Sequence, residues 1–194
     1  YIFHNINTTP ALHSSINTSI VTPLAVDVAY NTTELYIANG GSNNLTWYNG
    51  AVYNSSPVTT FGGTINMGAP VTFVAASRQS DVVYACTATT FQYVSTVSKT
   101  VTTSLTIGAN NQYISLSNDN KYAYITGTDF IYLVNLVTQA TSTIIALPVT
   151  PMDPLSAVVT PDGNRLFICG SDGTNQVVIY NVQKTQYSAY AVGT

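Results

Sequence analysis

The sequence predicts an all-β fold built from repeated four-stranded antiparallel sheets, the architecture of a β-propeller. A segment seen best at 155–181 (LSAVVTPDGNRLFICGSDGTNQVVIYN) recurs four times along the 194 residues. Within its second strand, Leu35, Val83, Ala123 and Leu166 occupy the same aligned position, so the copies are spaced by 48, 40 and 43 residues. Propeller blades repeat every ~40 to 50 residues. No window of the chain has a convincing helical period, so essentially no α-helix is expected.

Each copy predicts a strand, a tight turn, a second strand, a loop, and then a third and a fourth strand. In the fourth copy the turn is 161–164 (PDGN), where proline presets φ and glycine accepts a positive φ. In the third copy 118–120 (NDN) forms the same turn, because Asn and Asp tolerate the left-handed region. The predicted strands are 23–30, 35–39, 45–49 and 57–62 in the first copy; 71–77, 82–87, 91–95 and 101–107 in the second; 112–117, 122–126, 130–136 and 141–147 in the third; 155–160, 165–169, 176–182 and 187–192 in the fourth.

The first residues match the second half of a copy. Residues 1–6 resemble the third strand at 130–135, and 14–21 resemble the fourth strand at 142–149. Propellers often close by letting the two termini share one blade, yet the last copy already has four strands. We therefore expect part of a larger propeller, with a closed four-bladed ring carrying two additional strands as the alternative. The expected single domain, 1–194, divides into a half blade at 1–22 and blades at 23–66, 67–109, 110–150 and 151–194.

The composition excludes some functions. Charged residues make up 7% of the chain, with five Lys and Arg and a net charge of −3, which leaves no dense cationic surface for nucleic acid. No apolar run approaches the ~18 residues of a membrane span. Few charges and abundant Thr, Asn and Tyr are typical of exported β proteins, so an extracellular or cell-surface location is expected.

The two cysteines, Cys86 and Cys169, follow the aligned strand in the second and fourth copies. Equivalent positions in non-neighbouring blades lie beyond the ~7 Å Cα separation of a disulfide. We therefore predict two free, buried thiols that pack as small hydrophobic groups rather than act as nucleophiles.

The residues that carry chemistry form no recognisable catalytic set. Most acidic residues fall in predicted turns, where Asp caps its own backbone. Asp27 lies instead in a first strand near the channel axis, as a possible channel ligand or a hydrogen-bonded core residue. Asp172, in 171–175 (SDGTN), superficially resembles part of a Ca²⁺ loop without its further carboxylates, which favours a turn. His4 and His13 lie in the half blade, away from the inner strands where a hydrolase or metal centre would be built. No catalytic residue and no cofactor is predicted.

Aromatic residues give the best candidate for a binding surface. Trp47, Tyr48 and Tyr53 lie close together in sequence among polar residues. Such side chains bind sugar rings or protein partners, although aromatic residues in strands also serve simply to pack sheets. We keep both interpretations of these three residues.

The runs 158–168 (VVTPDGNRLFI) and 177–181 (VVIYN) resemble the YVTN-type β-propeller repeat, related to NHL and lactonase-like propellers, as do 35–39 (LYIAN) and 41–45 (GSNNL). The resemblance covers nearly the whole chain, but its motifs are turns and strands, and no catalytic motif matches. Members include surface-layer and cell-surface proteins, secreted binding proteins and some sugar-lactone hydrolases.

The regular repeats, the scarcity of titratable groups and the lack of a convergent site lead us to expect a non-enzymatic surface or secreted propeller. It would serve as a structural scaffold or as a binding module for a protein or glycan partner, or for further blades of the same or another chain. The alternative is a lactonase-like hydrolase whose active site lies partly in blades outside this chain.

Overall fold

The chain folds into β-sheets throughout the part that the computed structural model describes, which is residues 2–4, 11–14, 18–49, 60–147, 153–171 and 175–191. These residues form four antiparallel four-stranded sheets and one two-stranded sheet. No helix occurs among them, and hence none that is long and apolar enough to cross a membrane. The all-β prediction is confirmed.

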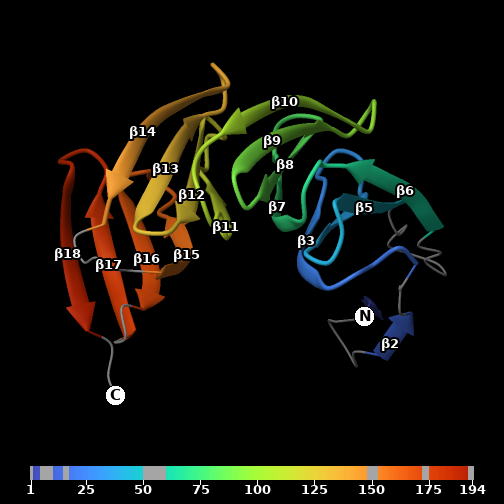
Figure 1. Ribbon diagram of the computed structural model, residues 1–194, viewed down its shortest axis with the longest axis horizontal. Coiled ribbons are helices and arrows are strands. Elements are labelled where there is room, and N and C mark those ends of the chain that lie inside the picture. Colours follow the sequence, from blue (N-terminus) through green and yellow to red (C-terminus); the bar gives the residue numbers. More distant parts are fainter. Residues whose placement is uncertain are drawn as a thin grey trace.

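The sheets follow the order of the chain, and strands adjacent in sequence are adjacent in each sheet. They succeed one another around an open arc, with the first strand of each sheet on the concave side and the fourth on the convex side (Figure 1). The strands are β1 (Ile2–His4) and β2 (Ala11–Ser14); β3 (Pro23–Val28), β4 (Leu35–Asn39), β5 (Asn44–Asn49) and β6 (Thr60–Asn66) in the first sheet; β7 (Val71–Ala76), β8 (Val82–Thr87), β9 (Thr90–Ser95) and β10 (Thr100–Thr106) in the second; β11 (Tyr113–Leu116), β12 (Tyr122–Gly127), β13 (Phe130–Asn135) and β14 (Ala140–Ala146) in the third; β15 (Asp153–Val159), β16 (Arg165–Ser171), β17 (Asn175–Asn181) and β18 (Gln186–Ala191) in the fourth.

The core consists of three apolar layers, one between each pair of consecutive sheets. Strand β8 shows how they form: Val83 and Ala85 pack against the first sheet, whereas Tyr84 and Cys86 pack against the third. Both faces of this strand are therefore buried, which explains why its sequence is apolar throughout instead of alternating.

The predicted turns form as their sequences indicate. Gly163 and Asn120 adopt φ values of 71° and 56°. Asp119 accepts hydrogen bonds from the hydroxyl of Ser117 and the backbone N–H of Lys121, and these bonds hold the pKa of its carboxyl below the usual value. Asp residues in these turns thus cap the local backbone, as expected.

Strand β6 ends later than predicted, because an end at residue 62 was expected and the strand is observed over Thr60–Asn66; residues 57–59 lie outside the described residues. In the structure a Cβ on Gly62 would lie 2.3 Å from the ring of Trp47. The glycine pair is therefore needed where the strand passes under the indole.

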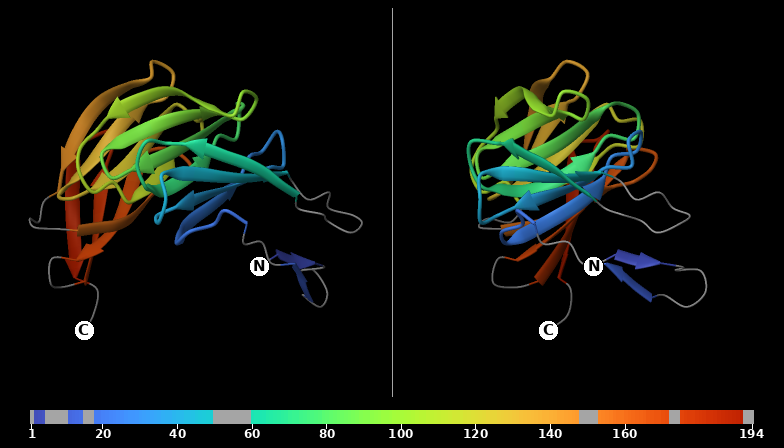
Figure 2. Two further views of the ribbon diagram at one scale, coloured as in Figure 1. Left: turned by 45° about the vertical axis from the view of Figure 1, so that its right-hand side comes forward. Right: turned by 90° about the vertical axis from the view of Figure 1, so that its right-hand side faces the viewer.

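The N-terminal hairpin also differs from its prediction. Strand β1 pairs antiparallel with β2, and the pair lies apart from the four larger sheets, beyond the first sheet (Figure 2). A strand was expected at 14–21, but β2 ends at Ser14 and a turn occupies 18–19. Here the backbone carbonyls of Thr18 and Ser19 accept hydrogen bonds from the side chains of Tyr48 and Thr46. The segment thus packs against the first sheet instead of forming a ladder.

Candidate functional site

A cavity of about 500 Å³ opens on the concave side of the arc, among β3, β7, β11, β15 and the turns that follow them. We call it the concave cavity. The rings of Phe73 and Tyr113 line it with their centroids 4.3 Å apart. Arg78, Asp27 and Asn118 add polar groups to the same lining.

Asp27 lies on the concave side, as predicted, and its carboxylate joins the first two sheets. Its Oδ2 accepts the backbone N–H of Ala76 at 2.8 Å, and its Oδ1 accepts the N–H of Val28 at 2.8 Å. A similar joint links the third and fourth sheets, where Oγ of Ser115 accepts the buried N–H of Val159 at 3.2 Å. The carboxylate is thus already engaged with backbone donors.

Other acidic side chains also connect neighbouring sheets. Asp81 accepts a hydrogen bond from Asn31 of the first sheet at 3.1 Å, and Asp153 accepts one from Gln112 at 3.1 Å. Within the described ranges, no three His, Cys, Asp or Glu residues gather to hold a metal ion. Asp172 lies outside the described residues, and His4 and His13 lie on β1 and β2, whose side chains are not described.

Trp47 belongs to a charged cluster at the contact between the first and second sheets. Lys99 Nζ lies 4.1 Å from the centroid of the Trp47 ring, 3.0 Å from Oη of Tyr36, and forms an ion pair with Glu34. The Lys99 and Glu34 side chains are 22% and 12% exposed. Burial, reinforced by the hydrogen bond and the charge of Glu34, raises the pKa of Tyr36. The indole therefore holds a buried cation of its own chain.

Of the two interpretations kept for the aromatic residues, packing is the one observed for Tyr48 and Trp47. Tyr48 is 2% exposed and its hydroxyl donates to the carbonyl of Thr18, so an exposed role for this ring was wrong. Trp47 is half-buried, in contact with Lys99 and Gly62, while Tyr53 lies outside the described residues. The sequence did contain a signal for the packing of Trp47, because the next strand, which pairs with the strand of this single Trp, contains a glycine pair at 62–63.

Both cysteines are free thiols, as predicted, but only one is buried. Burial raises the pKa of Cys86, which packs in the layer between the second and third sheets. Cys169 is exposed, and its predicted burial was wrong. The two residues share a position in their sheets, yet no described sheet covers the face of the fourth sheet on which Cys169 lies.

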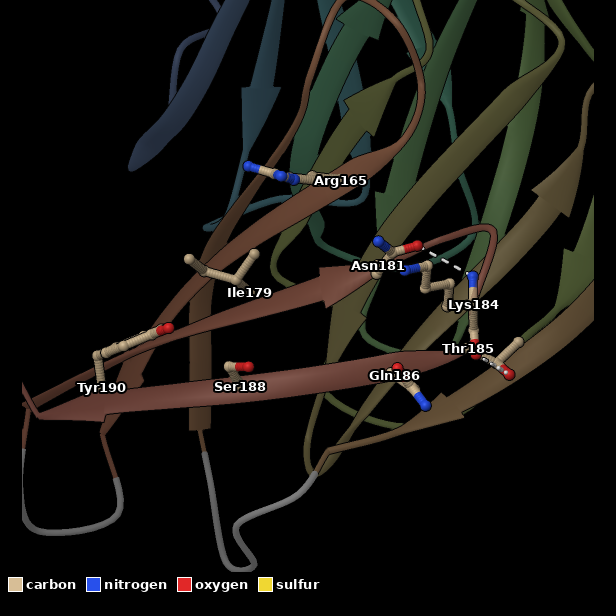
Figure 3. Close-up of a pocket in the computed structure, with 8 residues that line it drawn as sticks. All are labelled: Arg165, Ile179, Asn181, Lys184, Thr185, Gln186, Ser188 and Tyr190. Atoms are coloured by element: carbon tan, nitrogen blue, oxygen red, sulfur yellow. Dashed lines mark hydrogen bonds between the residues drawn. The ribbon is translucent and has the colours of Figure 1, made fainter.

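That face of the fourth sheet forms a second open surface, which we call the outward face. Its residues are Val158, Arg165, Phe167, Cys169, Val177, Ile179, Asn181, Gln186, Ser188 and Tyr190. A shallow hollow of about 570 Å³ runs across it, with side chains of β16, β17 and β18 on one side of the sheet (Figure 3). Val158 and Tyr190 are 60% and 56% exposed.

The outward face carries residue types that are buried elsewhere in the molecule. By register, Phe167, Cys169, Val177 and Ile179 of the fourth sheet correspond to the following residues of the second: Tyr84, Cys86, Phe91 and Tyr93. All four of the latter are at most 3% exposed, because the third sheet covers them. The outward face thus has the composition of a contact between sheets.

The structure is similar to that of hydrazine synthase from Kuenenia stuttgartiensis, with a TM-score of 0.78 and 15% sequence identity. The similarity covers 92% of this chain and 51% of the other, so the chain spans about half the length of that protein chain. At this identity the similarity shows the fold alone, a propeller-type arrangement of β-sheets. No protein-family model matches the chain. No curated protein matches it either.

Proposed function

We propose that the four sheets are consecutive blades of a larger β-propeller of the YVTN type, with β1 and β2 as a half blade. We further propose that this propeller is a non-enzymatic scaffold or binding module, located outside the cell or on its surface. The observation that carries the proposal is the use made of the charged side chains. Asp27, Asp81, Asp153 and the pair formed by Glu34 and Lys99 all connect one sheet to the next.

These connections favour a scaffold over the lactonase-like alternative. A catalytic carboxylate or a metal ligand needs free lone pairs directed at the substrate or the ion. Each oxygen of Asp27, the acidic residue of the concave cavity, already accepts one backbone N–H group, and these two bonds orient the carboxylate along the joint between the sheets. The hydrolase alternative therefore requires an active site supplied mainly by other blades.

Hydrolysis of a panel of aliphatic and sugar lactones, with and without Ca²⁺ or Zn²⁺, distinguishes the two functions. The scaffold proposal expects rates equal to those of buffer containing the same metal ions. Saturable turnover that follows the folded fraction of the protein and disappears on chelation would establish the hydrolase instead.

The outward face is proposed as the contact for one further blade of the same repeat type. The third sheet covers the corresponding residues of the second with Ile114, Ala123 and Ile125, and the fourth covers the third with Ala157 and Leu166. An incoming blade with a similar aliphatic face would bury Val158, Phe167 and Ile179 in the same way. Burial of apolar area of this kind is the main favourable contribution to such contacts.

The thiol of Cys169 reports directly on this contact. In the isolated 194-residue chain it should react rapidly with a maleimide, whereas Cys86 should react only on unfolding. In the protein isolated from its native source, a covering blade should slow labelling of Cys169 by about 100-fold or more. Equal labelling rates in the two preparations would refute the contact, and a Cys169→Ser variant identifies any signal that comes from Cys86.

A further inference from the structure

The edge of each inner strand presents backbone N–H groups to the concave side. Hydrogen-bonded and non-hydrogen-bonded residues alternate along an antiparallel strand. In β11 the N–H of Ser117 donates to the carbonyl of Tyr122, so the N–H of the preceding residue, Leu116, points away from β12 toward the concave edge. The same alternation places the N–H groups of Ala76 in β7 and Val159 in β15 on this edge.

Two of these three donors are capped by a side chain of the preceding sheet. Asp27 caps Ala76 and Ser115 caps Val159. The capping position lies opposite an aligned tyrosine of the second strand, and its occupants in the first three sheets are Asp27, Ala75 and Ser115. The methyl group of Ala75 offers no acceptor. No side chain in the described part of the chain accepts the N–H of Leu116, which therefore lacks the cap that its two counterparts have.

Ala75 and Leu116 both line the concave cavity, and so does Arg78. Arg78 is exposed and makes no ion pair with a described carboxylate. An uncapped backbone donor and an unpaired guanidinium in one cavity form an arrangement for an oxyanion, because charge-assisted hydrogen bonds from both are stronger than neutral ones. The rings of Phe73 and Tyr113 supply an apolar wall beside them.

We propose that the concave cavity binds a small monocarboxylate with a short apolar body. One carboxylate oxygen accepts the N–H of Leu116, and the charge is balanced by Arg78. Asp27 is the template, since its carboxylate makes the same bond to the equivalent N–H one sheet earlier at 2.8 Å. The proposal is limited to a single charge because Asp27 lines the same cavity and repels any anion, and Arg78 is the one cation that the described residues contribute to the lining to offset it. This inference deepens the proposed binding role and rests on it.

Isothermal titration of the 194-residue chain with sodium acetate, propionate and butyrate, against sodium chloride at equal ionic strength, tests the site. Saturable binding that strengthens with the length of the apolar body is expected. Arg78→Gln should weaken binding by about tenfold, as expected for loss of about 1.4 kcal/mol. Ala75→Ser should abolish it by supplying the hydroxyl that Ser115 supplies to the next sheet, and should leave the thermal midpoint equal or higher.

The matched control is Ala189→Ser, which makes the same change at an exposed position of β18, outside the lining of the concave cavity. Its affinity for propionate should equal that of the wild type. Absence of saturable propionate binding, or wild-type affinity in folded Ala75→Ser, would overturn the proposal. The proposal would also be overturned if a tripeptide with a free C-terminal carboxylate bound more than about tenfold tighter than propionate and the C-terminally amidated tripeptide did not, because the ligand would then be a polypeptide C-terminus.

Failure of this site and failure of the scaffold function are distinguishable. The lactone assay and the labelling of Cys169 involve neither Leu116 nor Arg78. A chain that passes both tests but binds no carboxylate retains its proposed function and loses only the assigned ligand.

Discussion

Replacement of Asp27 by alanine should destabilise the chain by about 2 kcal/mol, through the joint between the first two sheets. The variant removes both acceptors at once, leaving the N–H groups of Val28 and Ala76 without partners. Hydrogen bonds to charged groups contribute ~1.5 to 3 kcal/mol where the donor is shielded. The bond to Ala76 is partly buried and dominates, whereas the exposed bond to Val28 can be replaced by water and adds only a few tenths.

Urea unfolding followed by circular dichroism measures this loss as a change in midpoint at constant m-value. Asp27→Asn retains one acceptor oxygen and should lose about half as much. Ser115→Ala should lose ~1 kcal/mol, because it removes a neutral acceptor from the buried N–H of Val159. Asp153→Ala is the control, since its bond to Gln112 is exposed and its loss should stay below ~0.5 kcal/mol. If Asp27→Ala costs no more than this control, the carboxylate does not join the sheets.

Three further perturbations test the other contacts. Gly62→Ala should lower the free energy of unfolding by ~1 to 3 kcal/mol, because the added methyl group displaces the indole of Trp47. The loss should be smaller in a Trp47→Leu background. Unchanged fluorescence emission from this single Trp would argue against the displacement. Lys99→Met should lower the free energy of unfolding by about 2 kcal/mol, because it leaves the shielded carboxylate of Glu34 without its cation. Lys121→Met breaks an exposed ion pair and should lower it by less than ~0.5 kcal/mol. Equal losses in urea unfolding would contradict a stabilising role for the pair of Lys99 and Glu34. Burial raises the pKa of several tyrosines in the folded chain above the ordinary value of ~10. Above about pH 10 these tyrosines ionise in the unfolded chain but stay neutral in the folded one, and this difference favours unfolding. The unfolding free energy should stay level between about pH 6 and pH 10 and fall above that range, by up to ~1.4 kcal/mol per pH unit for each such residue. Tyrosinate absorbance that reaches the full value of the unfolded chain while the circular dichroism is still native would refute this. These residues are Tyr36, Tyr48, Tyr84, Tyr93, Tyr124 and Tyr180.

Local sequence was sufficient for the strands and turns and insufficient for the contacts between sheets. The order of elements in every copy, and the turn at 161–164, follow from proline and glycine chemistry and are observed in the structure. Alignment of the copies suggests, however, that equivalent residues have equal environments. This assumption led to the wrong prediction that Cys169 is buried, because burial depends on whether another sheet follows. The hydrogen bond from the N–H of Ala76 to Asp27 joins two sheets, so no residue adjacent to either in sequence predicts it.

The candidate site was only partly accessible to sequence for the same reason. Asp27 was correctly expected on the concave side, but its hydrogen-bond partners were not identifiable. Arg78 lies between the predicted strands 71–77 and 82–87, where no motif marks it as a ligand, and the significance of Ala75 appears only when its counterparts are known to cap the next sheet. For Trp47 the sequence left binding and packing open, and its contact with Lys99 was not identifiable because that residue is distant in sequence.

The caps described above run in one direction, since each side chain completes the sheet that follows it. Removal of either end sheet exposes one apolar layer, but removal of the first also strips the acceptor from Ala76, whereas removal of the fourth leaves the hydroxyl of Ser115 free to bond water. The chain should therefore tolerate shortening from its C-terminal side far better than from its N-terminal side. The same polarity suits growth on the ribosome, because the acceptor for each new edge has been synthesised before the strand that needs it.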